Sequence, residues 1–156
     1  MTSNLRFSAL LVVPALLLTF TPQVHAGINE TIPDAQTLSQ MEQRAQAANP
    51  RDQCYLYTEL VHTMTEMAVQ QIANGDDDNN TNAVLRQIDR YSHLIQASLA
   101  KNTKHLKNAE MLMHHTTLRL AESLHLASGD DRSNVQATLK QLDLVQDQIL
   151  NQVFNH

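Results

Sequence analysis

The sequence is poor in residues that cross-link a chain, break helices or form stacking surfaces. Its 156 residues include one Cys, three Gly, four Pro and no Trp, and aromatic residues make up 4%. Cys54 cannot form a disulfide within the chain, so it is either buried as a small hydrophobic residue or free to link two chains. The scarcity of Gly and Pro favours helices nearly throughout. Few aromatic rings remain to stack on bases or sugars.

Basic residues are also scarce. The chain has 11 Lys and Arg against 16 Asp and Glu, which gives a net charge of −5. Nucleic acids and anionic lipids attract proteins through basic surfaces, so this balance argues against non-specific binding to either. We therefore expect no nucleic-acid partner, and look to an unknown protein partner or to self-association.

The longest hydrophobic run lies at the start of the chain. Arg6 precedes an uncharged apolar stretch over residues 7–20, and small residues lead up to Ala26. This layout is typical of a secretory signal peptide over residues 1–26, because the run is shorter than the roughly 20 residues that span a bilayer. An uncleaved N-terminal anchor is the alternative. We expect an exported protein, periplasmic or secreted, that is not an integral membrane protein after cleavage.

The remaining residues predict a disordered lead over 27–33 and a single helical domain over 34–156. Apolar residues recur every three or four positions, the period of an amphipathic helix, and no strand signal or internal repeat stands out. Short connections between such helices favour antiparallel neighbours. The predicted class is therefore all-α, as a small antiparallel helical bundle or an elongated helical hairpin with one long central helix.

Polar residues, Gly and Pro predict where the first helices begin and end. Asp34 is placed to N-cap a helix that runs to about Ala48. Asn49 and Pro50 suit the start of a second helix, since Asn is a good N-cap and Pro fits the first helical position. Gly75 is placed just after the end of that helix.

Residues 81–127 carry an apolar stripe that keeps its helical phase with little break. Either one helix covers the whole range, or two helices meet near Asn102. A loop would normally reset the phase and contain Gly or Pro. We therefore favour one long or kinked helix.

Two sequence motifs resemble half-sites of di-iron proteins, in which Glu-x-x-His pairs on separate helices share a metal centre. They are Glu59-x-x-His62 and Glu122-x-x-His125. A di-iron centre needs these side chains inside the bundle. At about 100° per residue both pairs point away from the apolar faces, so we expect solvated side chains.

A second metal hypothesis rests on thioether and imidazole side chains, which suit copper. The candidate ligands are Met64, Met67, His114 and His115. Met64 and Met67 lie on an apolar face, however, where Met is a routine core residue. We assign no metal or other cofactor to the chain from these residues alone.

A second, partial apolar line runs along the segment 110–126, through Met111, Leu118 and Ala121, with His115 beside it. A helix that is apolar on two sides is either central in its own bundle or in contact with another chain. We favour the central position. As an interface, Met111, His115 and Leu118 would make association sensitive to pH through their histidine. No nucleophile motif accompanies Cys54 or any Ser, so we predict that the protein is not an enzyme.

The stretches ANPRDQCYLYTELVH (residues 48–62) and NTKHLKNAEMLM (residues 102–113) resemble short exported helical proteins of acidobacteria. The similarity extends over most of the region after the signal peptide. It implies export and a helical fold, and no particular activity.

These observations give two functional hypotheses. The first is an exported helical-bundle protein that acts by binding or assembly and not by catalysis. The alternative is a periplasmic metal-binding protein of copper type that uses Met and His ligands.

Overall fold

The computed structural model describes residues 33–76, 78–99 and 103–155. They form five helices, α1 (Ala35–Ala47), α2 (Gln53–Asn74), α3 (Asp78–Leu99), α4 (Leu106–Ser123) and α5 (Gly129–Phe154). The predicted all-α class is confirmed, and these ranges contain no strand. The signal peptide predicted over residues 1–26 and all but Pro33 of the predicted lead lie outside the described residues. Within the described ranges no helix combines the length and the apolar character that crossing a bilayer requires.

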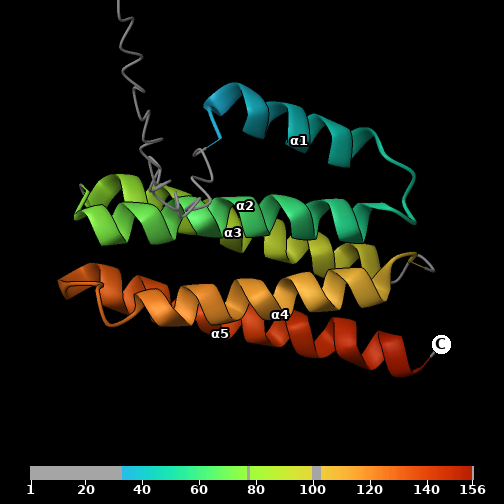
Figure 1. Cartoon of the computed structure of the whole chain (residues 1–156). Helices are drawn as coiled ribbons and strands as arrows, with labels where there is room; N and C mark the ends of the chain where they lie inside the picture. The colour runs from blue at the N-terminus through green and yellow to red at the C-terminus, as the bar shows by residue number, and fades with distance from the viewer. Residues whose placement is uncertain (1–32, 77, 100–102, 156) are drawn as a thin grey trace, which may run out of the picture. The chain divides into compact units, whose positions relative to one another are not determined.

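Four of the helices form a bundle of two stacked hairpins. The hairpin α2–α3 packs on the hairpin α4–α5 through two parallel pairs, α2 with α4 and α3 with α5, while α1 packs on α2. In Figure 1, α2 and α4 lie in front, and α3 and α5 lie behind them. Consecutive helices α3 and α4 do not pack on each other. The expectation of antiparallel neighbours therefore holds within each hairpin and is wrong between the hairpins.

The long central helix predicted over residues 81–127 is wrong. α3 ends at Leu99 and α4 begins at Leu106. The Thr103 hydroxyl donates to the Ser98 carbonyl at 3.0 Å, and His105 has a left-handed backbone with φ of 59°. This conformation costs a non-Gly residue about 1–2 kcal/mol, so the surrounding contacts must hold His105 in it. The apolar stripe keeps its phase because both helices bury it in one core.

The predicted helix ends are partly confirmed. Asp34 caps α1, since its side chain accepts a hydrogen bond from the Thr37 amide at 2.7 Å. Gly75 follows α2 with φ of 67°, and its amide donates to the Ile72 carbonyl at 3.2 Å. The predicted start of α2 is wrong by three residues. The Asn49 side chain instead accepts from the Arg51 amide at 3.0 Å, forming a turn before the helix.

Aliphatic residues from all four bundle helices fill the core. Leu60, Ile88, Met113 and Leu142 are each 0% exposed. Burying one such side chain contributes about 1.5–3 kcal/mol, so hydrophobic burial dominates the stability of the bundle. Cys54 is also fully buried, and this burial raises the pKa of its thiol to about 11. Of the two alternatives for Cys54, the structure shows the buried hydrophobic one.

The stacked hairpins share a sequence pattern, which overturns the prediction that the chain has no internal repeat. Residues 75–89, GDDDNNTNAVLRQID, align with residues 129–143, GDDRSNVQATLKQLD, with eight of fifteen positions identical. Both segments begin with a Gly of positive φ, 67° at Gly75 and 41° at Gly129. The aligned Ile88 and Leu142 both lie in the core. The repeat fits the parallel stacking, in which equivalent helices lie side by side.

Candidate metal centre between α2 and α4

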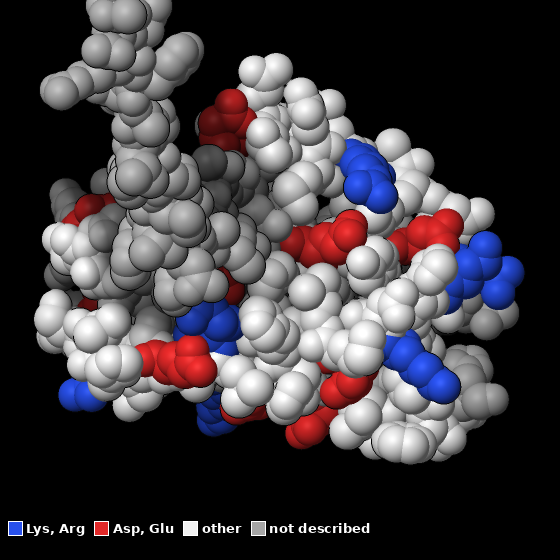
Figure 2. Space-filling model, in the orientation of Figure 1, with Lys and Arg blue, Asp and Glu red and all other residues white. Residues whose placement is uncertain are grey.

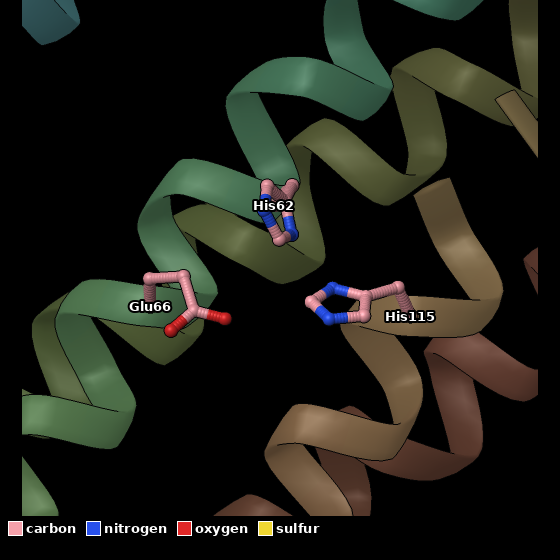
Figure 3. Close-up of side chains that lie close together, drawn as sticks. All are labelled: His62, Glu66 and His115. Atoms are coloured by element: carbon pink, nitrogen blue, oxygen red, sulfur yellow. The ribbon is translucent and has the colours of Figure 1, made fainter. Parts of the chain in front are cut away.

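Three ligand-type side chains meet where α2 packs on α4. His62 and Glu66 are one turn apart on α2, and His115 faces them from α4 (Figure 3). One ligand atom from each residue lies within 4.8 Å of the other two, and the imidazole rings are 5.4 Å apart between centroids. His62 and Glu66 are half-buried, whereas His115 is exposed. The cluster is therefore held at the protein surface and is open on one side.

Parallel packing of the two helices brings these residues together. Two side-chain pairs join α2 to α4 with nearly the same separation in sequence, His62 with Thr116 at 54 residues and Glu66 with Arg119 at 53. A constant separation is the signature of parallel elements in register. Any two residues about 53 positions apart along these helices are thus neighbours, which places His115 beside His62.

Thr116 orients the imidazole of His62, with 3.0 Å between His62 Nδ1 and Thr116 Oγ1. Since the Thr116 hydroxyl donates to the Leu112 carbonyl at 2.7 Å, we infer that its oxygen accepts a hydrogen bond from His62 Nδ1. A neutral imidazole that donates through Nδ1 carries its lone pair on Nε2. A second residue that orients an imidazole in this way is typical of histidines that bind metals.

Glu66 is held by a guanidinium group. Arg119 Nε and Nη2 donate to the two carboxylate oxygens of Glu66, each at 3.0 Å, and Arg119 Nη1 donates to Glu122 at 3.2 Å. The hydrogen bonds to Glu66 are the largest cause of a raised pKa for Arg119. Because Arg119 already bridges two carboxylates, it can keep Glu122 as a partner while one oxygen of Glu66 turns to a metal ion.

The three side chains fit a transition-metal ion of intermediate softness. Two imidazoles and one carboxylate form a common donor set of catalytic zinc sites, and imidazole also suits Cu(II). Ligand atoms of a tetrahedral zinc site are about 3.3 Å apart, given bonds of about 2.0 Å. The present separations are all within 4.8 Å, so rotation of side chains can bring the three ligand atoms to one ion. The exposed imidazole of His115 can rotate at little cost.

The structure brings only one of the predicted soft-metal ligands into this cluster. His115 faces α2, whereas the adjacent His114 lies beside Gln146 of α5, with 3.0 Å between Nδ1 and the amide nitrogen. Met64 is buried in the core, and Met67 is half-buried on α2. His114 and His115 thus point to different neighbours.

The two Glu-x-x-His motifs have different surroundings. Glu122, on α4, and His125, in the turn that follows it, are both exposed, as predicted. The prediction of a solvated side chain is wrong for His62, because α4 covers the polar face of α2 and supplies Thr116. The apolar side chains of α2 do not reveal this cover by α4, because the buried surface of the helix also includes two polar residues, Thr58 and Thr65.

The second apolar line on α4 lies at the surface. Met111 is 62% exposed and Leu118 is 50% exposed. The favoured interpretation, a position central to the bundle, is therefore wrong for these two residues. The line is part of the outer surface of α4.

His62 was considered as a metal ligand from the sequence and rejected as solvated, and Glu66 and Arg119 were not considered as part of a metal site. The structure pairs α2 with α4 at an offset of about 53 residues, which sets Glu66 beside Arg119, an acid beside a base, and His62 beside His115. The repeat has an offset of 54 residues and lies on α3 and α5, so it indicates that the hairpins are related without giving these pairs.

The comparisons with known proteins add no information about this site. The chain matches no protein-family model, no curated protein and no solved structure.

Proposed function

We propose that this protein binds a divalent transition-metal ion, of the class of Zn(II) or Cu(II), without catalysing a reaction. The observation that carries the proposal is the convergence of His62, Glu66 and His115, with one ligand atom of each inside 4.8 Å. A site of two nitrogens and one oxygen prefers these ions over Cu(I), which favours thioether sulfur. Of the earlier copper hypothesis, His115 and Cu(II) are kept, the Met ligands and His114 are replaced by His62 and Glu66, and Zn(II) is added.

Two parts of the proposed function, export and the lack of catalysis, rest on the sequence alone. The apolar leader over residues 1–26 predicts export, and the chain offers no nucleophile motif. Export and the lack of catalysis both stay predictions. An exported protein with an open, partly exposed metal centre is suited to bind or carry a metal ion.

The test is a calorimetric titration of the metal-free full chain with Zn(II), with a competing chelator if binding is tight. We expect one ion per chain, and an affinity that falls at acid pH because the imidazoles must be neutral to bind. His115→Ala removes a ligand and should weaken binding at least about tenfold, comparable with the loss of a supporting residue at natural sites.

His114→Ala is the matched control, because this neighbouring exposed histidine faces α5. It should leave the zinc affinity unchanged. Equal losses in both variants, or a wild-type affinity in His115→Ala, would overturn the proposal. Circular dichroism of both variants shows whether the helices are intact.

A second candidate function is self-association through the outer surface of α4. It is supported by Met111 and Leu118, which are large, exposed and two helical turns apart. A strip of this kind can meet its own copy across a two-fold axis. Light scattering from pH 5 to 8 tests this candidate. A dimer mass that Leu118→Glu reduces to that of a monomer supports it, and a constant monomer mass contradicts it.

A further inference from the structure

A second site lies at the end of the bundle where the α1–α2 and α3–α4 connections meet. A groove of about 790 Å³ opens there, and its lining includes Arg44, Tyr55, Lys104, His105 and Asn108. These residues come from α1, α2, the α3–α4 connection and α4. Figure 2 shows basic side chains, with acidic ones between them, at the right-hand end of the described unit, where Figure 1 places both connections.

The walls of the groove are fixed by contacts between the two connections. The Lys104 amide donates to the Arg51 carbonyl at 2.8 Å, so the connections are joined through their backbones. His105 lies 3.8 Å from the Asp52 carboxylate, and its ring is 5.9 Å from that of Tyr55. Its left-handed backbone is a conformation that bulky residues adopt only when their surroundings enforce it.

The charge of the groove is opposite to that of the protein. The chain has a net charge of −5, yet the groove lining contains Arg44 and Lys104 against one acid, Asp52, which faces His105. In the described ranges no carboxylate lies within 4.0 Å of the charged nitrogens of Arg44 or Lys104, whereas Arg90 and Arg119 both form ion pairs. Two cations from distant segments thus share one groove without acidic partners.

We propose that this groove binds a small organic or inorganic anion that carries carboxylate or phosphate groups. The Arg44 guanidinium can form paired hydrogen bonds with such a group, and Lys104 adds a second positive charge. The Asn108 amide lies in the same lining and provides a polar contact beside them, whereas the Tyr55 hydroxyl is hydrogen-bonded to Glu59. Tyr55 and Asn108 also line a neighbouring hollow that reaches His115, so the anion site and the metal centre lie along one side of the bundle.

The experiment titrates metal-free full chain with succinate and, separately, with inorganic phosphate, at constant ionic strength, and follows amide chemical shifts by NMR. Metal is absent, so the result does not depend on the metal centre. We expect saturable shifts at residues of the groove for at least one anion, with a Kd of about 1 mM or below. Saturation with succinate alone identifies a carboxylate site, and saturation with phosphate alone identifies a phosphate site.

Two double variants separate a specific site from general attraction of charges. Arg44→Ala/Lys104→Ala removes the two cations of the groove and should weaken binding at least tenfold. Arg132→Ala/Lys140→Ala removes the same charge from exposed positions of α5 and should leave the affinity unchanged. Non-saturating shifts with both anions, or equal weakening in the two double variants, would overturn the inference.

Discussion

The hairpins α2–α3 and α4–α5 share a repeat and a topology, yet they bury and expose different residues. The first hairpin contains Cys54, Tyr57 and Tyr91 in its interior and carries α1 on its surface. The second has no aromatic residue in its core and exposes Met111 and Leu118. Residues common to both hairpins, such as the two turn glycines, determine the fold, and residues that differ determine what each surface can bind.

The metal centre shows this division most clearly. α2 contributes His62 and Glu66, and α4 contributes His115 and Arg119. In either hairpin alone these side chains lie on a polar helix face and do not form a metal site. The stacking of the two hairpins brings the three ligand residues together. The parallel stacking of the hairpins therefore explains the geometry of the site, and the differences between α2 and α4 explain its composition.

The largest effect is expected from the aligned core residues Ile88 and Leu142. Both are 0% exposed, so Ile88→Ala and Leu142→Ala each leave a cavity and should lower the free energy of unfolding by about 3 kcal/mol. Urea denaturation measures both. If the hairpins form one cooperative core, the two losses are similar and both transitions stay two-state. A loss below about 0.5 kcal/mol in one variant would show that the two hairpins do not share one cooperative core.

The turn glycines should give a smaller and again matched effect. Gly75 and Gly129 have φ of 67° and 41°, and a Cβ at either position would meet no atom within 4 Å. The cost of Gly75→Ala and of Gly129→Ala is therefore a backbone cost, about 1.5 kcal/mol each. Thermal unfolding of the two variants checks this. A neutral Gly129→Ala would show that the second turn does not need the left-handed conformation.

The ion pair between hairpins should contribute less, because water reaches it. Arg119 is 37% exposed and Glu66 is 13% exposed, so a double-mutant cycle of Glu66→Gln and Arg119→Gln should give a coupling of about 0.7 kcal/mol. The pair Glu42–Arg90, which joins α1 to α3 at 3.5 Å with Arg90 58% exposed, is the control. Its coupling should be about 0.3 kcal/mol or less. Equal couplings would mean that the bidentate geometry adds nothing.

The smallest effect concerns Tyr91, a buried tyrosine of the first hairpin. Burial, followed by a hydrogen bond to Glu42, raises the pKa of Tyr91 to about 12 from 10.0. A pKa raised by folding stabilises the protein fully below pH 10, and this contribution is lost between pH 10 and 12. Absorbance at 295 nm should show a late-titrating phenol that Tyr91→Phe removes. The same late component in Tyr91→Phe would contradict the assignment.

The sequence predicts the helices well because their signals are local. The Asp34 cap and the end of α2 at Gly75 follow from residues within one turn of each end. The break between α3 and α4 was missed because it contains neither Gly nor Pro. There a His takes the left-handed conformation, held by contacts with the α1–α2 connection.

The candidate site was harder to predict because its residues meet only in the tertiary structure. A helical wheel of α2 separates polar His62 from the apolar face, and cannot show that α4 covers the polar face as well. Of the four copper candidates, His115 alone belongs to the cluster, and His62 was named from sequence in a di-iron motif that we rejected. The register of α2 against α4 was the missing information, since it defines which turns of the two helices are neighbours.

The position of a bound metal ion tests the proposed site most directly. Crystals of the full chain grown with one equivalent of Zn(II) should give a single strong anomalous peak at the zinc edge, between α2 and α4. His62 Nε2, an imidazole nitrogen of His115 and an oxygen of Glu66 should lie about 2.0–2.2 Å from that peak. A zinc ion bound elsewhere, with His62 still bonded only within the protein, would contradict it.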